Sequence, residues 1–247
     1  MSDVRIFPDE DSLARAAANR FVQDANQAIA ARGRFAVALA GGSTPRPLYT
    51  RLASPEFARL LDWTRVHVFW GDERCVPPED ARSNYRMARE TLLDAVAIPH
   101  ASVHRIRGEA DPRSAASAYE KVLREFFRRE GPGPVVTFDL VLLGLGEDGH
   151  TASLFPGRRP VAERERWVLA DYLERASMWR ITLTPVPLNL ASHVLFVVSG
   201  APKAGCVRDV LEGPSVPDTL PAQATRPAHA RLSWYLDQAA GAGLRAK

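Results

Sequence analysis

Residues 139–157 read Asp139-Leu-Val-Leu-Leu-Gly-Leu-Gly-Glu-Asp-Gly-His150-Thr-Ala-Ser-Leu-Phe-Pro-Gly157. The apolar residues 140–143 are consecutive rather than alternating, which is typical of a buried strand in a parallel sheet. The glycines that follow allow a tight turn and a close approach of the backbone to a ligand. Because ligands in open α/β sheets bind beyond the carboxyl ends of strands, we expect Asp148 and His150 to lie in a functional site.

The same loop matches G-x-G-x-x-G over residues 144–149, which is the fingerprint of dinucleotide-binding domains. Asp171 follows about twenty residues later, near the position of a ribose-binding acid. However, Glu147 and Asp148 place negative charge where a pyrophosphate needs bare backbone amides. The pattern also lies past the midpoint of the chain instead of in a first βα turn. We therefore favour a catalytic loop over a dinucleotide site, and no cofactor is predicted.

Composition indicates an ordinary globular protein. The chain has 247 residues, of which 46% are hydrophobic and 25% charged, with a formal net charge of +3. Its basic residues are scattered and form no stripe with aromatic residues, so nucleic-acid binding is not predicted. The sequence shows no apolar run of membrane-spanning length and no signal-peptide core at its start, so we expect a cytoplasmic protein that does not bind membranes. The two cysteines, Cys75 and Cys206, are expected to be reduced thiols.

Apolar runs and helical patterns alternate along the chain. Strands are expected at residues 4–7, 35–40, 66–70, 103–106, 140–143, 167–170, 181–183, 194–198 and 232–236. Helices are expected from residue 9 or 11 to 31, from 45, and over residues 84–93, 111–130, 187–191, 201–211 and 237–244. This alternation predicts a single α/β domain, residues 1–247, with a mostly parallel central sheet and helices on both faces.

A second loop follows the strand at 35–40 and reads Gly41-Gly42-Ser43-Thr44-Pro45. Proline suits the first turn of a helix, and free amides at a helix start together with two hydroxyls form a small anion site. The alternative is an ordinary capped helix start, because Ser and Thr are common N-caps. Paired glycines directly after a strand favour phosphate binding.

Charged side chains follow two further strands. Asp72, Glu73 and Arg74 come directly after residues 66–70. The two acids could orient sugar hydroxyls or act as a base, and Arg74 could pair with phosphate, although such clusters are often solvated turns. Lys203 follows the strand at 194–198 and could neutralise a phosphate, or could be a plain surface lysine.

The remaining candidates for chemistry are weaker. Spacing of His, Cys and carboxylate residues suggests no metal site. Ser153 lacks the G-x-S-x-G elbow of serine hydrolases. His67 and His193 lie in or beside strands and are expected to be packed or hydrogen-bonded rather than catalytic.

Several segments resemble the 6-phosphogluconolactonases of the glucosamine-6-phosphate isomerase/6-phosphogluconolactonase family. The matching segments cover nearly the whole chain in family order: Ala40-Gly-Gly-Ser-Thr-Pro45, Phe69-Trp-Gly-Asp-Glu-Arg74, Ser83-Asn-Tyr85, Gly144 to Gly157, Arg180-Ile-Thr-Leu-Thr184, Ser199-Gly-Ala-Pro-Lys-Ala204 and Leu220-Pro-Ala-Gln223. The run His150-Thr-Ala-Ser-Leu-Phe-Pro-Gly157 is highly specific. One segment departs from the family, which usually has a proline-rich stretch with a lysine where this chain reads Leu173-Glu-Arg-Ala-Ser-Met-Trp179.

The resemblance implies a three-layer, Rossmann-like α/β/α sandwich and hydrolysis of 6-phospho-D-glucono-1,5-lactone. Histidine titrates in the range a general base needs, so His150 is expected to deprotonate the attacking water. Asp148 would orient the imidazole or the water, or stabilise the turn. Amides around Gly149, or Arg74, would stabilise the oxyanion.

The phosphate would be held by a further set of residues. These are Ser43, Thr44, Arg74 and Lys203, with Gly41 and Gly42 allowing close approach and Arg180 as an additional candidate. A sugar-phosphate lactone is thus the expected partner, with the protein a monomer or weak homo-oligomer.

Two other functions remain open from the sequence. A sugar-phosphate isomerase or deaminase of the same fold would use Asp72 as its proton-abstracting base. Deaminases, however, resemble Ile-Ala-Phe-Asn-Glu where this chain has Thr151-Ala-Ser-Leu-Phe155. A sugar-phosphate sensor without turnover is the second alternative, but such regulators usually carry a helical DNA-binding domain, and none precedes residue 35 in this sequence.

Overall fold

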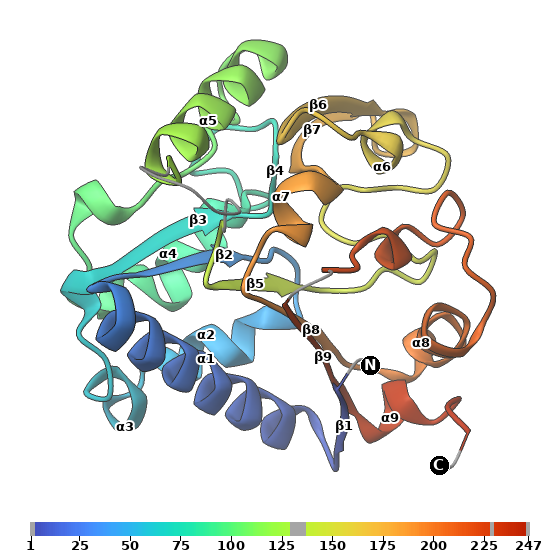
Figure 1. Ribbon diagram of the computed structural model, residues 1–247, viewed down its shortest axis with the longest axis horizontal. Helices are drawn as coiled ribbons and strands as arrows, with labels where there is room; N and C mark the ends of the chain where they lie inside the picture. The colour runs from blue at the N-terminus through green and yellow to red at the C-terminus, as the bar shows by residue number, and fades with distance from the viewer. Residues whose placement is uncertain (1–2, 129–136, 228–229, 246–247) are drawn as a thin grey trace.

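Within the part of the chain that the structure describes, six parallel strands form the central sheet, in the order β1-β9-β8-β5-β2-β3 (Figure 1). The computed structural model describes residues 3–128, 137–227 and 230–245. The strands are β1 (Asp3–Phe7), β2 (Phe35–Leu39), β3 (Val66–Trp70), β5 (Leu140–Leu143), β8 (His193–Val198) and β9 (Arg231–Asp237). Every residue of β2, β5 and β8 is buried, as expected of parallel strands covered on both faces. The expected α/β fold with a mostly parallel central sheet is confirmed.

Helices cover both faces of this sheet. Figure 1 shows α1 (Glu10–Arg32) and α2 (Pro45–Ala53) on one face, and α5 (Pro112–Phe126), α7 (Pro185–Asn189) and α8 (Ala204–Glu212) on the other. Further α-helices are α3 (Pro55–Ala58), α4 (Asn84–Thr91), α6 (Arg159–Ala162) and α9 (Gln238–Gly241). The two helical layers and the sheet between them form the three-layer sandwich.

The course of the chain creates a crevice between β2 and β5. From β1 the chain passes through α1 to β2 and through α2 to β3, moving toward one edge of the sheet. It then returns through α5 to β5 and continues in the opposite direction to β8 and β9. Since β2 and β5 are neighbours, the loops that follow them diverge to opposite faces. Such a point of reversal is where open α/β sheets bind ligands.

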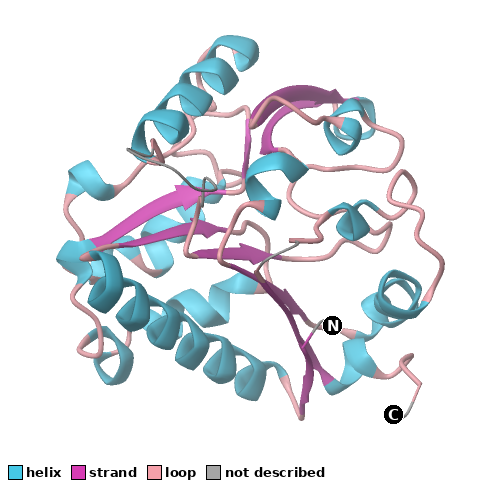
Figure 2. Cartoon of the chain, in the orientation of Figure 1, coloured by secondary structure: helices cyan, strands magenta, loops and turns pink. Residues whose placement is uncertain are grey.

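A second, antiparallel sheet stands apart from the first (Figure 2). Its strands, in the order β4-β7-β6, are β4 (Asp72–Arg74), β7 (Met178–Leu183) and β6 (Val168–Leu173). The strands expected at 167–170 and 181–183 therefore exist, but they pair with each other outside the parallel sheet. The charged residues 72–74, expected as a loop, form a strand because their backbone pairs with residues 180–182 of β7.

Two further expectations need correction. Residues 103–106 do not form a strand, since Val103 makes only an isolated bridge to Val68. The closing helix expected over 237–244 is shorter, because α9 ends at Gly241. The helix expected over 111–130 exists as α5 but ends at Phe126, and residues 129 and 130 lie outside the described residues.

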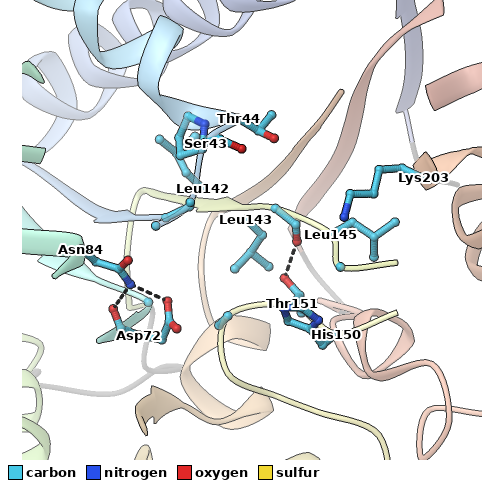
Figure 3. Close-up of a pocket in the computed structure, with 18 of the residues that line it drawn as sticks. Ser43, Thr44, Asp72, Asn84, Leu142, Leu143, Leu145, His150, Thr151 and Lys203 are labelled. Atoms are coloured by element: carbon cyan, nitrogen blue, oxygen red, sulfur yellow. Dashed lines mark hydrogen bonds between the residues drawn. The ribbon is translucent and has the colours of Figure 1, made fainter. Parts of the chain in front are cut away.

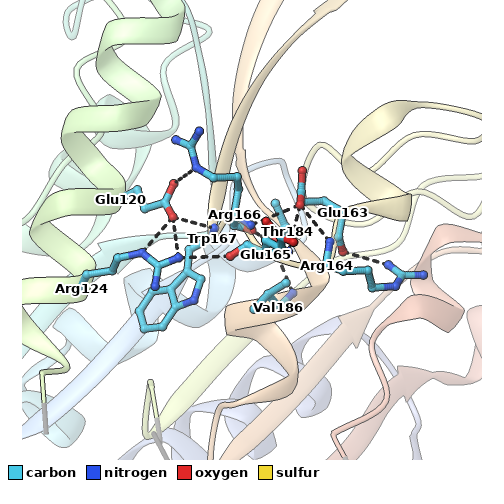
Figure 4. A network of polar contacts seen from close by, with 9 residues as sticks. All are labelled: Glu120, Arg124, Glu163, Arg164, Glu165, Arg166, Trp167, Thr184 and Val186. Carbon is cyan, nitrogen blue, oxygen red and sulfur yellow. Dashed lines mark hydrogen bonds and ion pairs between the residues drawn. The ribbon is translucent and has the colours of Figure 1, made fainter.

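A buried carboxylate joins α5 to the second sheet (Figure 4). Glu120 lies on α5 and is 5% exposed. Its oxygens accept hydrogen bonds from Arg166 Nε at 2.6 Å, from the Trp167 backbone N–H at 3.1 Å and from Arg124 Nη2 at 2.8 Å. These contacts fix the start of β6, and through the β6–β7 pairing they also fix the position of β4.

Candidate active site

A cavity of about 220 Å³ opens at the crevice between β2 and β5 (Figure 3). Its walls come from the loops after β2, β3 and β5, together with the starts of α4 and α8. Among the residues predicted for the site, eight line this cavity: Gly41, Gly42, Ser43, Thr44, Asp72, Arg74, His150 and Lys203. Asp148, Gly149 and Arg180 are not among the residues that line it. The structure therefore brings most of the predicted residues, which are distant in sequence, to one place.

His150 is held in place by Asp148. The Nδ1 atom of His150 lies 2.5 Å from Asp148 Oδ1. Burial acts to raise the pKa of Asp148, but the hydrogen bond and charge of His150 and a hydrogen bond from Arg175 outweigh it and lower this pKa to about 2. An ionised carboxylate at this distance makes Nδ1 the protonated ring nitrogen and leaves Nε2 free to accept a proton. Asp148 thus orients the imidazole without lining the cavity itself.

Gly149 does not have the position expected of an oxyanion donor. Its backbone N–H donates to the Gly146 carbonyl at 3.1 Å, so this amide is used within the turn. Its carbonyl accepts from Ala222 at 2.9 Å, and its φ of +80° lies in the left-handed region. Gly149 therefore shapes the loop and packs it against Leu220, where a Cβ would meet a side-chain carbon at 2.8 Å.

The loop after β2 presents hydroxyl groups to the cavity. Thr44 is the N-cap of α2, yet within the described part of the chain its side chain makes no capping hydrogen bond. The alternative of an ordinary capped helix start is therefore not what the structure shows. Gly42 has a φ of +92°, which turns the chain sharply between strand and helix. The hydroxyls of Ser43 and Thr44 and the start of α2 form a surface suited to an anion.

Asp72 is oriented by two residues that the sequence analysis did not assign. Asn84 Nδ2 donates to Asp72 Oδ1 at 3.1 Å (Figure 3). Ser153 Oγ donates to Asp72 Oδ2 at 2.6 Å. Asn84 approaches the glycine loop so closely that a Cβ on Gly41 would lie 2.0 Å from its Oδ1. The only sequence signals were the positions of Asn84 and Ser153 within two of the family-like segments.

Glu73 has a structural role rather than a role in binding. It is 2% exposed, and its carboxylate accepts from the backbone N–H groups of Asn84 at 2.7 Å and Tyr85 at 2.8 Å. The Ser83 hydroxyl donates to it at 3.1 Å. Burial raises the pKa of Glu73, while these N–H donors act to lower it. The carboxylate therefore ties the start of α4 to β4 and does not face a ligand.

Arg74 and Arg180 are neighbours across the second sheet. Arg74 of β4 pairs in register with Arg180 of β7. The Nε and Nη1 atoms of Arg180 are buried without a hydrogen-bond partner among the described residues. Burial and the nearby charge of Arg74 lower the pKa of Arg180. Two adjacent guanidinium groups, one of them lining the cavity, give this wall a strong attraction for anions.

Lys203 completes the opposite wall. It lies at the start of α8, and its Nζ is 3.9 Å from Glu147 Oε1, which is a long ion pair. Its ammonium group is therefore only loosely held and can turn toward a ligand in the cavity.

Other candidates lie away from the cavity. His193 is buried, and its ring nitrogens lie 2.7 Å from Asp24 Oδ2 and 3.0 Å from Ser233 Oγ, as expected of a hydrogen-bonded histidine.

Across the described ranges, no group of three or more His, Cys, Asp or Glu residues is placed to hold a metal ion. No helix within those ranges is both long and apolar enough to cross a membrane.

Comparison with known proteins identifies the family. The model described as "Glucosamine-6-phosphate isomerases/6-phosphogluconolactonase" matches residues 8–234. The chain belongs to this family. Within the family it is similar to the 6-phosphogluconolactonase of Nostoc sp., with 40% identity over 243 residues and 98% of each chain covered. It is also similar to that of Synechocystis sp., with 42% identity over 89% of this chain and 88% of the relative.

The architecture agrees with the family assignment. A solved structure of 6-phosphogluconolactonase from Trypanosoma brucei superposes with a TM-score of 0.88 at 31% identity, covering 99% of both chains. The family resemblance predicted from the sequence motifs is thereby confirmed.

Proposed function

We propose that this protein hydrolyses 6-phospho-D-glucono-1,5-lactone to 6-phosphogluconate in the oxidative pentose phosphate pathway. The observation that carries the proposal is the convergence, on one cavity, of an oriented histidine and of groups that bind a phosphate (Figure 3). The relatives named 6-phosphogluconolactonase support the choice of substrate.

His150 is the general base in this proposal. Its Nε2 removes a proton from water, and the water oxygen attacks the lactone carbonyl carbon. When the tetrahedral intermediate collapses, the bond from this carbon to the ring oxygen breaks. The imidazolium then returns the proton to the leaving ring oxygen, so the enzyme ends the cycle unchanged. Asp148 stabilises the imidazolium through Nδ1.

The phosphate binds between the glycine loop and the cationic walls. Ser43 and Thr44 donate hydroxyl hydrogen bonds, while Arg74 and Lys203 supply positive charge from opposite sides. Arg180, the partner of Arg74 in the β4–β7 register, adds a second positive charge beside it. Gly41 and Gly42 keep the loop free of side chains, so the phosphate can approach its backbone.

The remaining polar groups orient the sugar and its developing charge. The Gly149 N–H is used within its turn, so stabilisation of the oxyanion falls to a neighbouring amide of this loop or to Arg74. Asp72 has a fixed orientation through Asn84 and Ser153 and can accept a hydrogen bond from a sugar hydroxyl. This arrangement gives Asp72 a positioning role in the lactonase reaction.

The experiment compares acid release from freshly prepared lactone with its spontaneous opening. His150→Ala should lower kcat by roughly two to four orders of magnitude, the usual contribution of a general base. His100→Ala is the matched control, since His100 is exposed and lies outside the cavity. Wild-type turnover in the His150 variant, or ammonia release from amino-sugar phosphates by the native protein, would contradict the proposal.

A further inference from the structure

The turn between β6 and β7 reaches the candidate active site. This β6–β7 turn, Glu174–Ser177, lies within the segment that departs from the family pattern. The Nη2 atom of its Arg175 lies 2.7 Å from Asp148 Oδ2. Asp148 uses its other oxygen for His150, so its carboxylate bridges the arginine and the imidazole.

Arg175 makes a second contact that leads to the same imidazole. Its guanidinium carbon lies 4.5 Å from the centre of the Phe155 ring. The Phe155 ring centre lies in turn 4.4 Å from that of His150. Phe155 is 7% exposed, so its ring holds a defined position against which the guanidinium can pack. Arg175 is therefore connected to His150 in two ways, through the Asp148 carboxylate and through the Phe155 ring.

The turn that carries Arg175 is itself held in a defined place. Arg158 donates to both carboxylate oxygens of Asp171, at 2.8 and 2.9 Å, and to the Tyr172 carbonyl at 2.7 Å. It also pairs with Glu174 at 2.9 Å. A bidentate pair of this kind fixes direction as well as distance. The backbone beside Arg175 is thus anchored to the chain that follows Gly157.

We propose that Arg175 is a positioning residue for the reaction, which aims the His150 ring by fixing the carboxylate of Asp148 and packing on Phe155. This inference rests on the proposed lactonase function. Arg175 touches neither the cavity nor the phosphate-binding groups, so its effect is on the rate of the chemical step and not on substrate binding. Small errors in the placement of a catalytic group cost large factors in rate.

The first test separates kcat from KM in Arg175→Ala. The variant should fold, because the Arg175 side chain is 54% exposed and such ion pairs add little to stability. We expect kcat to fall about ten-fold to a hundred-fold, with KM within about two-fold of the native value. Arg175→Lys should recover part of the lost kcat, since an ammonium group can still pair with Asp148.

The matched control is Arg113→Ala. Arg113 also stacks on an aromatic ring of this hairpin, Trp179, at 5.8 Å, but it lies outside the cavity lining. Its removal should leave kcat and KM unchanged. A native kcat in Arg175→Ala, or a change confined to KM, would overturn the proposal.

A double-mutant cycle tests the route through the carboxylate. If Arg175 acts through Asp148, adding Arg175→Ala to Asp148→Asn should lower kcat by much less than the same change does in the native protein. Equal and independent losses would overturn that route.

A different result would show that the proposed lactonase function itself is wrong. A native protein that does not accelerate lactone opening contradicts the proposed function. In that case the His150 ring signals in NMR spectra of the ligand-free protein still test Arg175, because they should change in Arg175→Ala and not in Arg113→Ala. Unchanged signals would overturn the positioning role independently of any assay.

Discussion

Gly146 occupies a position where only a hydrogen atom fits. An added Cβ would lie 1.9 Å from His150 Nδ1 and 2.7 Å from Asp148 Oδ1. The second glycine of the G-x-G-x-x-G pattern is therefore explained by the carboxylate–imidazole pair that it accommodates. At this position the glycine of a nucleotide-binding pattern makes room for the Asp148–His150 pair and not for a pyrophosphate.

Gly146→Ala should lower kcat by about ten-fold or more, because the methyl group displaces the imidazole from Asp148. Steady-state hydrolysis of the lactone measures this loss. The control is Gly205→Ala in α8, where an added Cβ would meet nothing within 4 Å, and activity should be retained. Unchanged turnover in Gly146→Ala would show that the contact between Asp148 and His150 is not needed.

Among the elements, α5 and the second sheet depend on Glu120. Burial acts to raise the pKa of Glu120, but the Trp167 N–H, Arg166 and Arg124 outweigh it, and the net shift is downward. A carboxylate with a lowered pKa stabilises the fold at any pH above its unfolded value, near 4.3 by the usual reference. This stabilisation is lost as the pH falls through the lower, folded value.

Glu120→Gln should lower the free energy of unfolding at neutral pH by about 1–2 kcal/mol, since a charged hydrogen-bond acceptor is lost. The figure is modest because the side chains of Arg124 and Arg166 are 48% and 46% exposed. Urea denaturation at pH 7 and pH 4 measures it, and the difference from the native protein should shrink at the lower pH. On the same helix, Glu125→Gln removes an exposed pair with Lys121 and should change stability by less than about 0.5 kcal/mol.

How far the sequence predicts the elements depends on where their pairing partners lie. Residues 140–143 were identified because an unbroken apolar run is itself the signal of a buried parallel strand. Asp72–Arg74 was missed as a strand because three charged residues have no strand pattern. They are extended because their backbone pairs with the edge of β7. No local property of the sequence predicts this pairing between β4 and β7.

The same limit applies to the candidate site. Gly41–Thr44, Asp72 and His150 were identified because each follows a strand, and the carboxyl ends of parallel strands share one edge of the sheet. The contact between Arg175 and Asp148 depends on how a separate hairpin folds over that edge. The sequence marked this segment as unusual but contained no signal for its contact.

At the scale of the whole molecule, a half-buried histidine pair is expected to contribute to the response to acid. His104 stacks on Phe69 with ring centres 4.4 Å apart, and its Nε2 lies 3.4 Å from Nδ1 of His67. Burial, together with the nearby His67, lowers the pKa of His104 to about 4. Between this value and the unfolded value of about 6.5 the unfolded chain binds a proton that the folded protein does not. Stability should therefore fall as the pH decreases across this window.

His104→Phe removes the titrating group and keeps the aromatic stack. Between pH 6.5 and pH 4.5 the free energy of unfolding of the native protein should fall by about 1–2 kcal/mol more than that of this variant. Each unit of pKa shift corresponds to about 1.4 kcal/mol, and the figure is reduced because His104 is partly exposed. Chemical denaturation across this pH range measures the difference. Parallel pH dependences in the two proteins would show that His104 is not the group responsible.

The pairing of β1 with β9 has a consequence for how the protein is made. β1 pairs with β9 over its full length, from Asp3↔Ser233 to Phe7↔Asp237, and β9 separates it from β8. A ribosome releases the amino end first, so β1 emerges long before its neighbour exists. Throughout most of translation this nascent strand has no place in the sheet, because β9, which comes far later in the chain, must leave the exit tunnel before the two can pair.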